Sequence, residues 1–295
     1  RCEPMEITID PDAGFCFGVT RAIRMAEEAA KKGPVASLGD IVHNPEEVHR
    51  LKNQGIGSVT HSELPKMQGG VVLLRAHGEP PSTYEIAHLC DLNLIDATCP
   101  IVAGVQKKIK KAYKEVLAAH GQIAIYGKPD HPETIGLKGQ TKNSAIVITE
   151  IADLETIDYN RPLWLFAQTT MQPATFSMIT DEIRKRFHQA GRNPDKMLRV
   201  SNTLCRYVSG REEKIRKFAR RFDVIVFVSG ANSSNGKFLY SCCKEENPRS
   251  YFVSHANELK QEWFAGTSSI GISGATSTPQ WLMEEVQSRI MELEK

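Results

Sequence analysis

The chain has 295 residues, of which 41% are hydrophobic and 24% charged, as in an ordinary globular protein with a sizeable core. Its 37 Lys and Arg residues nearly balance 35 Asp and Glu, so the net charge of +2 predicts no nucleic-acid partner. No apolar run approaches the roughly 20 residues that span a bilayer, and no signal-peptide pattern opens the sequence. We therefore expect a cytoplasmic protein without a membrane partner.

One pattern occurs three times along the chain. A β-type apolar run leads into a turn with a single cysteine, and a helical pattern follows; the three cysteines are Cys16, Cys99 and Cys205. Seven cysteines at long spacings do not resemble the disulfide framework of a secreted protein. The simplest geometry is three α/β lobes, at 16–98, 99–204 and 205–295, that meet at a centre lined by thiols.

The predicted elements alternate between strands and helices in each lobe. In the first lobe we expect strands at 35–39, at 70–75 and just before Cys99, and helices at 20–32, 46–53 and 82–89. In the second we expect strands at 122–127, 145–148 and 163–167, and helices at 102–120 and 173–187. In the third we expect strands at 223–228, 250–253 and 268–272, and helices around Cys242-Cys243 and at 280–293. This alternation predicts parallel sheets, which bind ligands at the carboxyl ends of their strands.

The motif cysteines are candidate metal ligands. Each lies at a turn between strand and helix, where a helix N-terminus favours thiolate. Three thiolates without a fourth protein ligand suit a catalytic iron–sulfur cluster or zinc. For the other cysteines, Cys2, Cys90, Cys242 and Cys243, we expect burial as small apolar side chains.

Polar residues follow the predicted strands. His43, His77 and His131 could bind an anion or exchange protons near neutral pH, although a single loop histidine is more often a surface residue. Two roles for Glu133 are equally consistent with the sequence. It could be a carboxylate in the first turn of a helix, where the helix dipole favours negative charge, or a buried general acid. The basic run 107–111 fits a solvated helix face better than a nucleic-acid patch.

Two groups of short polar side chains stand before helices of the third lobe. They are Ser233-Ser234-Asn235 and Ser277-Thr278-Pro279. Helix capping explains each group separately. Hydroxyls at the start of a helix also bind phosphate, so two such groups in a lobe with a motif cysteine favour a phosphorylated ligand.

Together these motifs resemble the 4-hydroxy-3-methylbut-2-enyl diphosphate reductase family, from residue 5 to residue 295. The motifs are Gly14-Phe15-Cys16-Phe17-Gly18-Val19, Ile41-Val42-His43-Asn44-Pro45, Arg75-Ala76-His77-Gly78, Asp96-Ala97-Thr98-Cys99-Pro100, His131-Pro132-Glu133, Gln168-Thr169-Thr170, Asn202-Thr203-Leu204-Cys205, Ser233-Ser234-Asn235 and Ala275-Thr276-Ser277-Thr278-Pro279. Tyr207, Val208 and Glu212 depart from the pattern that the family commonly has after the third cysteine.

The resemblance implies a fold and a reaction. The three lobes would form a trefoil around one [4Fe–4S] cluster, and strand 5–15 would join the sheet of the third lobe. The reaction would be reductive dehydroxylation of an allylic diphosphate to isopentenyl and dimethylallyl diphosphate, the last step of the methylerythritol phosphate route to isoprenoids. Electrons would come from a ferredoxin- or flavodoxin-type partner.

The resemblance also implies a role for each site residue. Cys16, Cys99 and Cys205 would ligate three irons and leave the fourth open. The diphosphate would be bound by His43, His77, Ser233, Ser234, Asn235 and Ser277, with His131 also lining the pocket. Glu133, with Thr169 nearby, would supply the proton for loss of water.

Three other functions fit part of this pattern. A quinolinate-synthase-like or aconitase-like dehydratase would also use three cysteines and an open iron, but two phosphate-type helix starts argue against it. An iron–sulfur electron carrier would need a fourth thiolate. Structural zinc is the simplest metal alternative.

Overall fold

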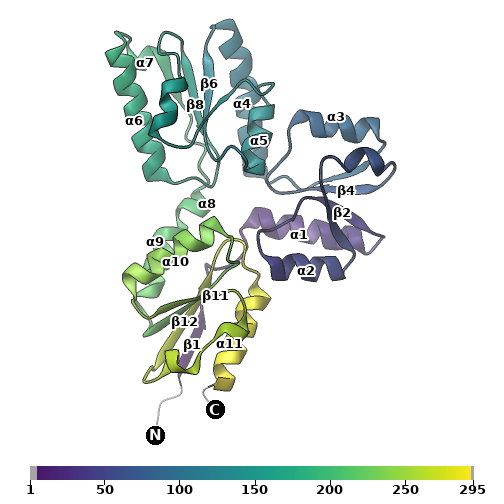
Figure 1. Cartoon of the computed structure of the whole chain (residues 1–295), viewed down its shortest axis with the longest axis vertical. Coiled ribbons are helices and arrows are strands. Elements are labelled where there is room, and N and C mark those ends of the chain that lie inside the picture. Colours follow the sequence, from purple (N-terminus) through teal and green to yellow (C-terminus); the bar gives the residue numbers. More distant parts are fainter. Residues whose placement is uncertain (1–4, 294–295) are drawn as a thin grey trace. The chain divides into compact units, whose positions relative to one another are not determined.

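The structure is a computed structural model that describes residues 5–293, except for the side chain of Ser234. It contains three sheets of four parallel strands each (Figure 1), which confirms the predicted α/β class with three lobes. Cys2, which we expected to be buried, lies outside the described residues. No helix in the described part of the chain has both the length and the apolar character needed to cross a membrane.

The chain divides into two compact units. The first unit takes in the described parts of Arg1–Glu27, Asp40–Ile56 and Gly210–Lys295, and the second takes in Glu28–Gly39 and Gly57–Ser209. The lobe boundaries that we place after residues 98 and 204 remain a prediction.

The first unit contains the sheet in the order β1-β12-β10-β11. Its strands are β1 (Glu6–Ile9), β10 (Val224–Val228), β11 (Ser250–Val253) and β12 (Ser269–Gly274). Its main helices are α2 (Pro45–Asn53), α9 (Arg211–Ala219), α10 (Ser234–Glu246) and α11 (Gln280–Leu293). The first strand of the chain thus pairs in parallel with its last strand, Ile7 opposite Ile270.

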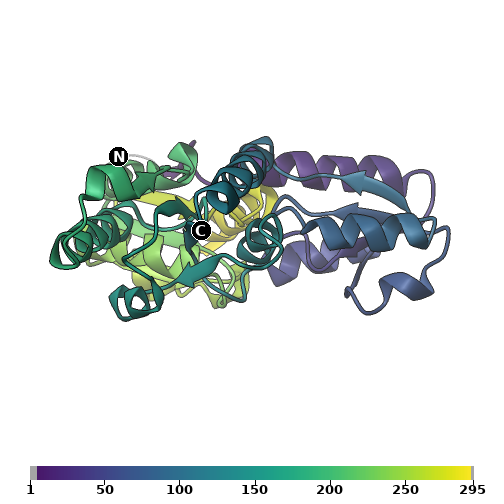
Figure 2. The ribbon, with the colours of Figure 1, turned by 90° about the horizontal axis from the view of Figure 1, so that it is seen from above.

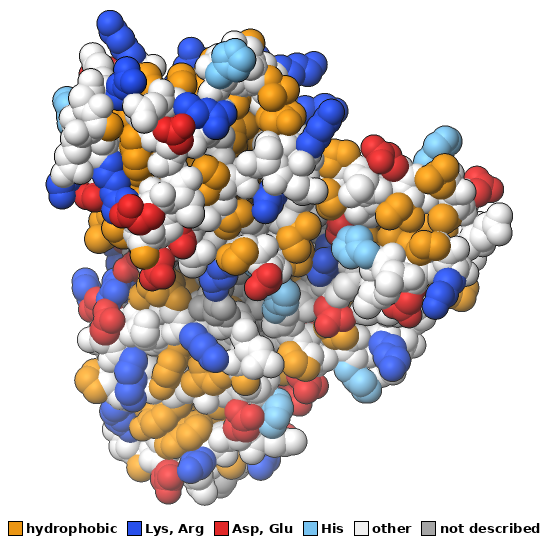
Figure 3. All heavy atoms as spheres, turned by 45° about the horizontal axis from the view of Figure 1, so that its top comes forward, with side chains coloured by type: hydrophobic (Ala, Val, Ile, Leu, Met, Phe, Trp, Pro, Cys, Tyr) orange, Lys and Arg blue, Asp and Glu red, His pale blue; other side chains and the backbone are white. Residues whose placement is uncertain are grey.

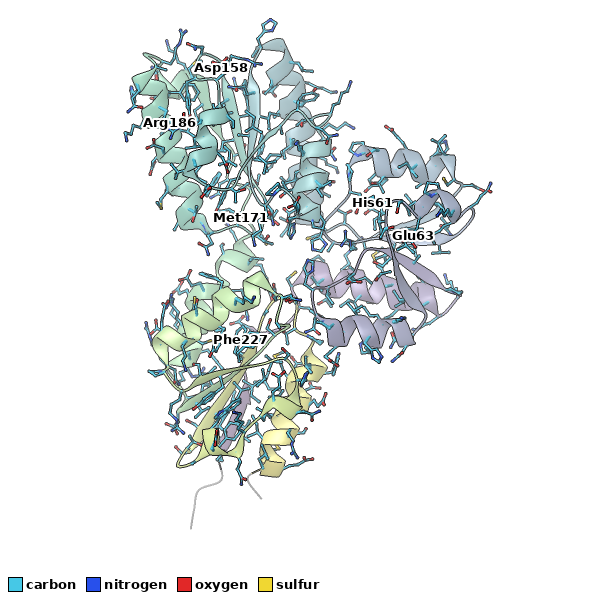
Figure 4. All side chains as sticks on the ribbon, viewed as in Figure 1. His61, Glu63, Asp158, Met171, Arg186 and Phe227 are labelled. Carbon is cyan, nitrogen blue, oxygen red and sulfur yellow. The ribbon has the colours of Figure 1, made fainter. Side chains whose placement is uncertain are left out.

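Strand β10 shows why helices cover both faces of this sheet. Successive side chains of a strand point to opposite faces. Ile225 and Phe227 pack with the apolar side chains of α9 and α10, whereas Val226 packs with those of α11. Phe227 is labelled in Figure 4. Because both faces are buried, the sequence of β10 is apolar throughout and shows no alternation.

The second unit contains two sheets. One has the order β3-β2-β4-β5, with strands β2 (Val35–Leu38), β3 (Ile56–Val59), β4 (Val71–Leu74) and β5 (Asn93–Asp96). Helix α3 (Pro81–Leu89) and the short 3₁₀ helix η1 (Leu64–Lys66) pack against its buried residues Leu38, Val72 and Leu74. Helix α1 (Phe17–Ala30) begins in the first unit and ends in the second as one continuous helix, purple in Figure 2.

The other sheet of the second unit has the order β7-β6-β8-β9. Its strands are β6 (Gln122–Tyr126), β7 (Ile146–Ile148), β8 (Leu163–Ala167) and β9 (Leu198–Val200). Ile123 and Ile125 pack with α4 (Pro100–Ala118) and α5 (Pro132–Gly139). On the opposite face, Ala124 and Tyr126 pack with α6 (Pro173–Gln189).

Short elements complete the chain. They are α7 (Pro194–Met197), α8 (Arg206–Ser209), and the 3₁₀ helices η2 (Ile151–Thr156), η3 (Ala256–Glu258) and η4 (Gln261–Phe264). The predicted helices agree with the observed ones to within three residues at each end. Strand β3 was not predicted, because its residues Gly57 and Ser58 are exposed and the strand carries no run of apolar residues. It also did not predict that the helix after Cys205 divides into α8 and α9 at Gly210.

Candidate active site

Every site residue predicted in the second unit lies just beyond the carboxyl end of a parallel strand. His77 follows β4, Cys99 follows β5, His131 and Glu133 follow β6, Thr169 follows β8, and Cys205 follows β9. Met171, labelled in Figure 4, marks the turn that follows β8. The carboxyl ends of parallel strands are where such sheets bind ligands, so the topology agrees with a catalytic role for these residues.

Proline starts the helices that hold two of these residues. Pro100 opens α4 and Pro132 opens α5, so Cys99 and His131 become the N-cap residues. Proline suits the first helical position because its fixed φ is already helical and no N–H bond is lost there. Each side chain is therefore held at a helix N-terminus, where the helix dipole favours negative charge.

Glu133 is a buried carboxylate, 2% exposed. Its Oε1 accepts the backbone N–H of Thr169 at 2.7 Å, and its Oε2 accepts the Thr169 hydroxyl at 2.9 Å. Burial raises the pKa of Glu133 to about 7, and the two hydrogen bonds from Thr169 oppose that rise. A carboxyl group with this pKa can hold and release a proton near neutral pH, which a general acid requires.

The hydrogen bonding of His131 indicates its tautomer. Its Nδ1 accepts the backbone N–H of Glu133 at 3.2 Å, so a neutral ring carries its proton on Nε2. The ring of His77 lies edge-on to it, with centroids 5.4 Å apart and an interplanar angle of 73°. The structure thus brings together two of the three histidines predicted to bind an anion.

Thr169 also connects Glu133 to a motif cysteine. The backbone N–H of Cys205 donates to the carbonyl of Thr169 at 2.8 Å. A similar bond joins the N–H of Cys99 to the carbonyl of Ala76 at 3.0 Å, beside His77. In the second unit, backbone hydrogen bonds therefore connect Thr169, which holds Glu133, to Cys205, and connect the residue before His77 to Cys99.

Gln168 supports this arrangement, although the sequence analysis gave it no role. Its buried Oε1 accepts the backbone N–H of Lys128 and the hydroxyl of Thr134, each at 3.0 Å. Its Nε2 donates to the hydroxyl of Thr170 at 2.8 Å. Gln168 thereby ties the loop after β8 to the loop after β6. Its place in a polar tripeptide that directly follows an apolar strand was the available signal.

Glu79 is a second buried carboxylate that the sequence analysis missed. It is 3% exposed and accepts hydrogen bonds from the ring of His61 at 2.7 Å and the hydroxyl of Thr83 at 3.1 Å. The guanidinium of Arg75 lies 3.9 Å away. Because Glu79 is two residues from His77, these contacts fix the loop that carries the histidine. His61 is labelled in Figure 4.

In the first unit, two loops with hydroxyl groups meet after β10 and β12. Ser233 caps α10, its Oγ accepting the N–H of Gly236 at 3.0 Å, and this Oγ lies 3.5 Å from that of Ser277. Asn235 Oδ1 accepts the hydroxyl of Thr276 at 3.1 Å. The capping role predicted for Ser233 is confirmed. The side chain of Ser234, another predicted ligand of the diphosphate, lies outside the description.

The loops of His43 and Cys16 lie against these two loops of the first unit. A Cβ on Gly230, which precedes Ser233, would lie 3.1 Å from the carbonyl oxygen of His43. A Cβ on Gly14, whose φ is +91°, would lie 3.3 Å from the carbonyl of Thr278, next to Ser277. The positive φ of Gly14 favours glycine there, and a side chain at either position would require the facing backbone to shift by a few tenths of an ångström.

The three motif cysteines fit a metal centre by their chemistry. None of the described cysteines forms a disulfide. The carbonyl of each motif cysteine accepts the first N–H bond of a helix: Cys16 from Thr20 at 3.0 Å, Cys99 from Ala103 at 2.9 Å, and Cys205 from Ser209 at 2.9 Å. All three thiols thus have the same local position, at which a helix N-terminus stabilises a negatively charged ligand. Cys242 and Cys243, by contrast, are buried between α10 and the sheet, as expected. The same expectation was wrong for Cys90, which is only partly buried because it lies at the C-terminal end of α3.

The fold and the site together define a class of protein: an α/β protein with three parallel sheets. The carboxyl ends of its strands present cysteines, histidines, hydroxyl groups and one carboxyl group with a pKa of about 7. Comparison with known protein families shows which family this is. The family model described as "LytB protein" matches residues 7–291, so the chain belongs to this family.

The chain is similar to proteins named 4-hydroxy-3-methylbut-2-enyl diphosphate reductase. The one from Parabacteroides distasonis is 44% identical over 98% of both chains. The one from Phocaeicola vulgatus is 46% identical over 97% of this chain and 99% of its own. A solved structure described as that of the (E)-4-hydroxy-3-methyl-but-2-enyl diphosphate reductase, the terminal enzyme of the non-mevalonate pathway, aligns with a TM-score of 0.76. It is 37% identical and covers 98% of this chain and 99% of its own.

Proposed function

We propose that this chain is an oxidoreductase that converts 4-hydroxy-3-methylbut-2-enyl diphosphate to isopentenyl and dimethylallyl diphosphate. The substrate's C–O bond breaks and its hydroxyl leaves as water. Two electrons and two protons are consumed: one proton completes the water, and the other forms the new C–H bond of the product. The family membership, with identity above 40% over nearly the whole chain, supports this assignment.

The cofactor assigned to this reaction is one [4Fe–4S] cluster with three cysteine ligands. Cys16, Cys99 and Cys205 would hold it, since their shared position before a helix suits thiolate ligands. When bound, such a cluster supplies electrons one at a time and acts as a Lewis acid. The fourth iron would have no protein ligand.

The observation that carries the proposal is the buried pair of Glu133 and Thr169. At neutral pH a carboxyl group with a pKa of about 7 is partly protonated, so it can supply the proton with which the hydroxyl leaves as water. Thr169 keeps that carboxyl in one orientation through two hydrogen bonds. His131, whose Nδ1 is occupied by the Glu133 N–H, can donate from Nε2.

We assign diphosphate binding to neutral donors and histidines. These are His43, His77, His131, Ser233, Ser234, Asn235 and Ser277. Hydroxyls and backbone N–H groups at a helix start bind phosphate without a neighbouring cation. Ser233 and Asn235 stand at the start of α10 and therefore suit this role.

The reaction also needs a donor of electrons, and we assign that role to a ferredoxin- or flavodoxin-type protein. We place the enzyme in the cytoplasm, since its reduced cysteines are typical of a reducing compartment.

The function is tested by anaerobic oxidation of a reduced viologen dye on addition of 4-hydroxy-3-methylbut-2-enyl diphosphate to the cluster-loaded protein. We expect turnover that depends on substrate and forms both five-carbon diphosphates. A brown, fully loaded protein that does not oxidise the dye would contradict the proposal and favour a dehydratase without redox change.

A further inference from the structure

Helix α4 presents a row of exposed lysines that the proposed chemistry does not use. They are Lys107, Lys108, Lys110, Lys111 and Lys114. Among residues 5–293, none of these lysines has a carboxylate within ion-pair distance. The single acidic residue of the helix, Glu115, is engaged elsewhere, because its Oε2 binds the guanidinium of Arg199 at 3.1 Å. The face therefore keeps its positive charge.

Helix α9 is another basic helix of this chain, but its cations are paired. Lys214 binds Asp12 at 2.7 Å, Lys217 binds Glu213 at 2.6 Å, and Arg216 contacts Glu212 at 3.1 Å and Glu245 at 2.8 Å. Both helices are rich in basic residues, but only the charge of α9 is neutralised by its own neighbours. Basic side chains, blue in Figure 3, are frequent on the lobe at the top of that view, to which α4 belongs.

The start of α4 adds an apolar contact beside a proposed cluster ligand. Ile101, two residues after Cys99, is 45% exposed. Exposed large apolar residues also follow the other motif cysteines: Phe17 is 66% exposed and Tyr207 is 43% exposed. At a rise of 1.5 Å per residue, Lys107 lies about 12 Å along the helix from Cys99. Helix α4 thus offers an apolar contact near the thiol and positive charges farther away.

We propose that the lysine-bearing surface of α4 docks a small acidic one-electron carrier of the ferredoxin type, with Ile101 at the N-terminal edge of this surface, on the side of the helix that carries Lys108. The inference rests on the proposed function, which consumes two electrons per substrate. Two successive encounters supply them, and at each one a reduced carrier leaves oxidised. Electron-transfer complexes are small and transient, and complementary charge raises their rate of association. The apolar start of α4 brings the carrier close to Cys99, which matters because electron transfer slows steeply with distance.

The test compares two double variants that change the net charge equally. Lys107 and Lys111 lie one helical turn apart on α4. The double variant Lys107→Glu with Lys111→Glu reverses both of their charges. Lys185→Glu with Lys196→Glu reverses two exposed lysines elsewhere in the second unit. The probe is a purified acidic bacterial ferredoxin. Its affinity for each protein is measured directly at low and at physiological salt, and turnover is measured with ferredoxin and with the small viologen dye.

We expect the α4 variant to bind ferredoxin at least about ten-fold more weakly at low salt and to lose ferredoxin-driven turnover in proportion. Its viologen-driven turnover should match the wild type, and the control variant should stay within about two-fold. Equal ferredoxin binding by the α4 variant and the wild type would overturn the proposal, as would equal losses in both variants. Absence of viologen turnover in the wild type would instead refute the proposed function, while the binding measurement still decides the docking face.

Discussion

The two units of this protein carry different polar groups, which suit the two different tasks that we propose for them. In the second unit, the buried carboxyl of Glu133 is shifted to a pKa of about 7 and is fixed by Thr169. In the first unit, the groups after β10 and β12 are hydroxyls, an amide and helix N–H groups, represented by Ser233, Asn235 and Ser277. The comparison teaches that a proton donor must titrate in the working range, whereas hydroxyl, amide and N–H donors keep the same charge at every pH. Any pH dependence of diphosphate binding would therefore come from the histidines that we also assign to it.

Removing the carboxyl group gives the largest effect. Glu133→Gln should lower turnover by about 10²- to 10⁴-fold, the usual contribution of a positioned general acid, with iron content and colour unchanged. The matched control is Glu79→Gln, which neutralises another buried carboxylate of the same unit. We expect that control to lower kcat much less. Because Glu79 holds the loop of His77, its loss should instead raise KM. Similar losses in both variants would assign the effect to burial of charge and not to proton donation.

The same substitution should change how stability depends on pH. The pKa of Glu133 is raised in the folded protein from an ordinary value of 4.5 to about 7, so between these values the folded state binds more protons. The free energy of unfolding of the wild type therefore falls as pH rises through this window, by at most about 3 kcal/mol. Glu133→Gln removes this fall. Urea unfolding at several pH values tests it, and parallel stability curves would contradict it.

In the first unit, loss of one hydroxyl should weaken substrate binding without a pH dependence. Ser277→Ala leaves the cap of α10 intact, because Ser233 makes that bond. A lost hydrogen bond to a charged group costs about 1.5 to 3 kcal/mol, so we expect KM to rise by about ten-fold or more and kcat to stay nearly constant. Ser288→Ala on the exposed side of α11 is the control. A fall in kcat with unchanged KM would move Ser277 out of the binding role.

The smallest effect should come from the hydroxyl that holds Glu133. Thr169→Val removes one of the two hydrogen bonds that lower the pKa of Glu133, so that pKa rises further. The alkaline limb of the turnover profile, where the acid loses its proton, should then move to higher pH. Thr169→Ser retains the hydroxyl and should behave as the wild type does. A limb that stays in place in the valine variant would separate Thr169 from the proton donor.

Much of this architecture could be predicted from the sequence, because it depends on local signals. Apolar runs such as 224–228 predicted the strands, and helical spacing of apolar residues predicted helices such as 102–120. Parallel topology then placed the polar residues at the carboxyl ends of the strands. Strand β3 was not predicted because its two middle residues, Gly57 and Ser58, are exposed and interrupt any apolar run.

The energetic state of the site could not be predicted in this way. From the sequence, the two roles of Glu133 were equally plausible, since its burial depends on side chains far away in the chain. Thr169, 36 positions later, supplies both of its hydrogen bonds. The supporting roles of Gln168 and Glu79 likewise depend on contacts between separate loops, which no local pattern reveals.

Infrared difference spectroscopy of the protein against its Glu133→Gln variant tests the central claim most directly, since it observes the carbonyl stretch of the protonated carboxyl itself. We predict that the band of Glu133 is present below neutral pH and disappears with a midpoint near pH 7. A midpoint close to the ordinary value of 4.5 would show that Glu133 is fully ionised at neutral pH and cannot be the proton donor.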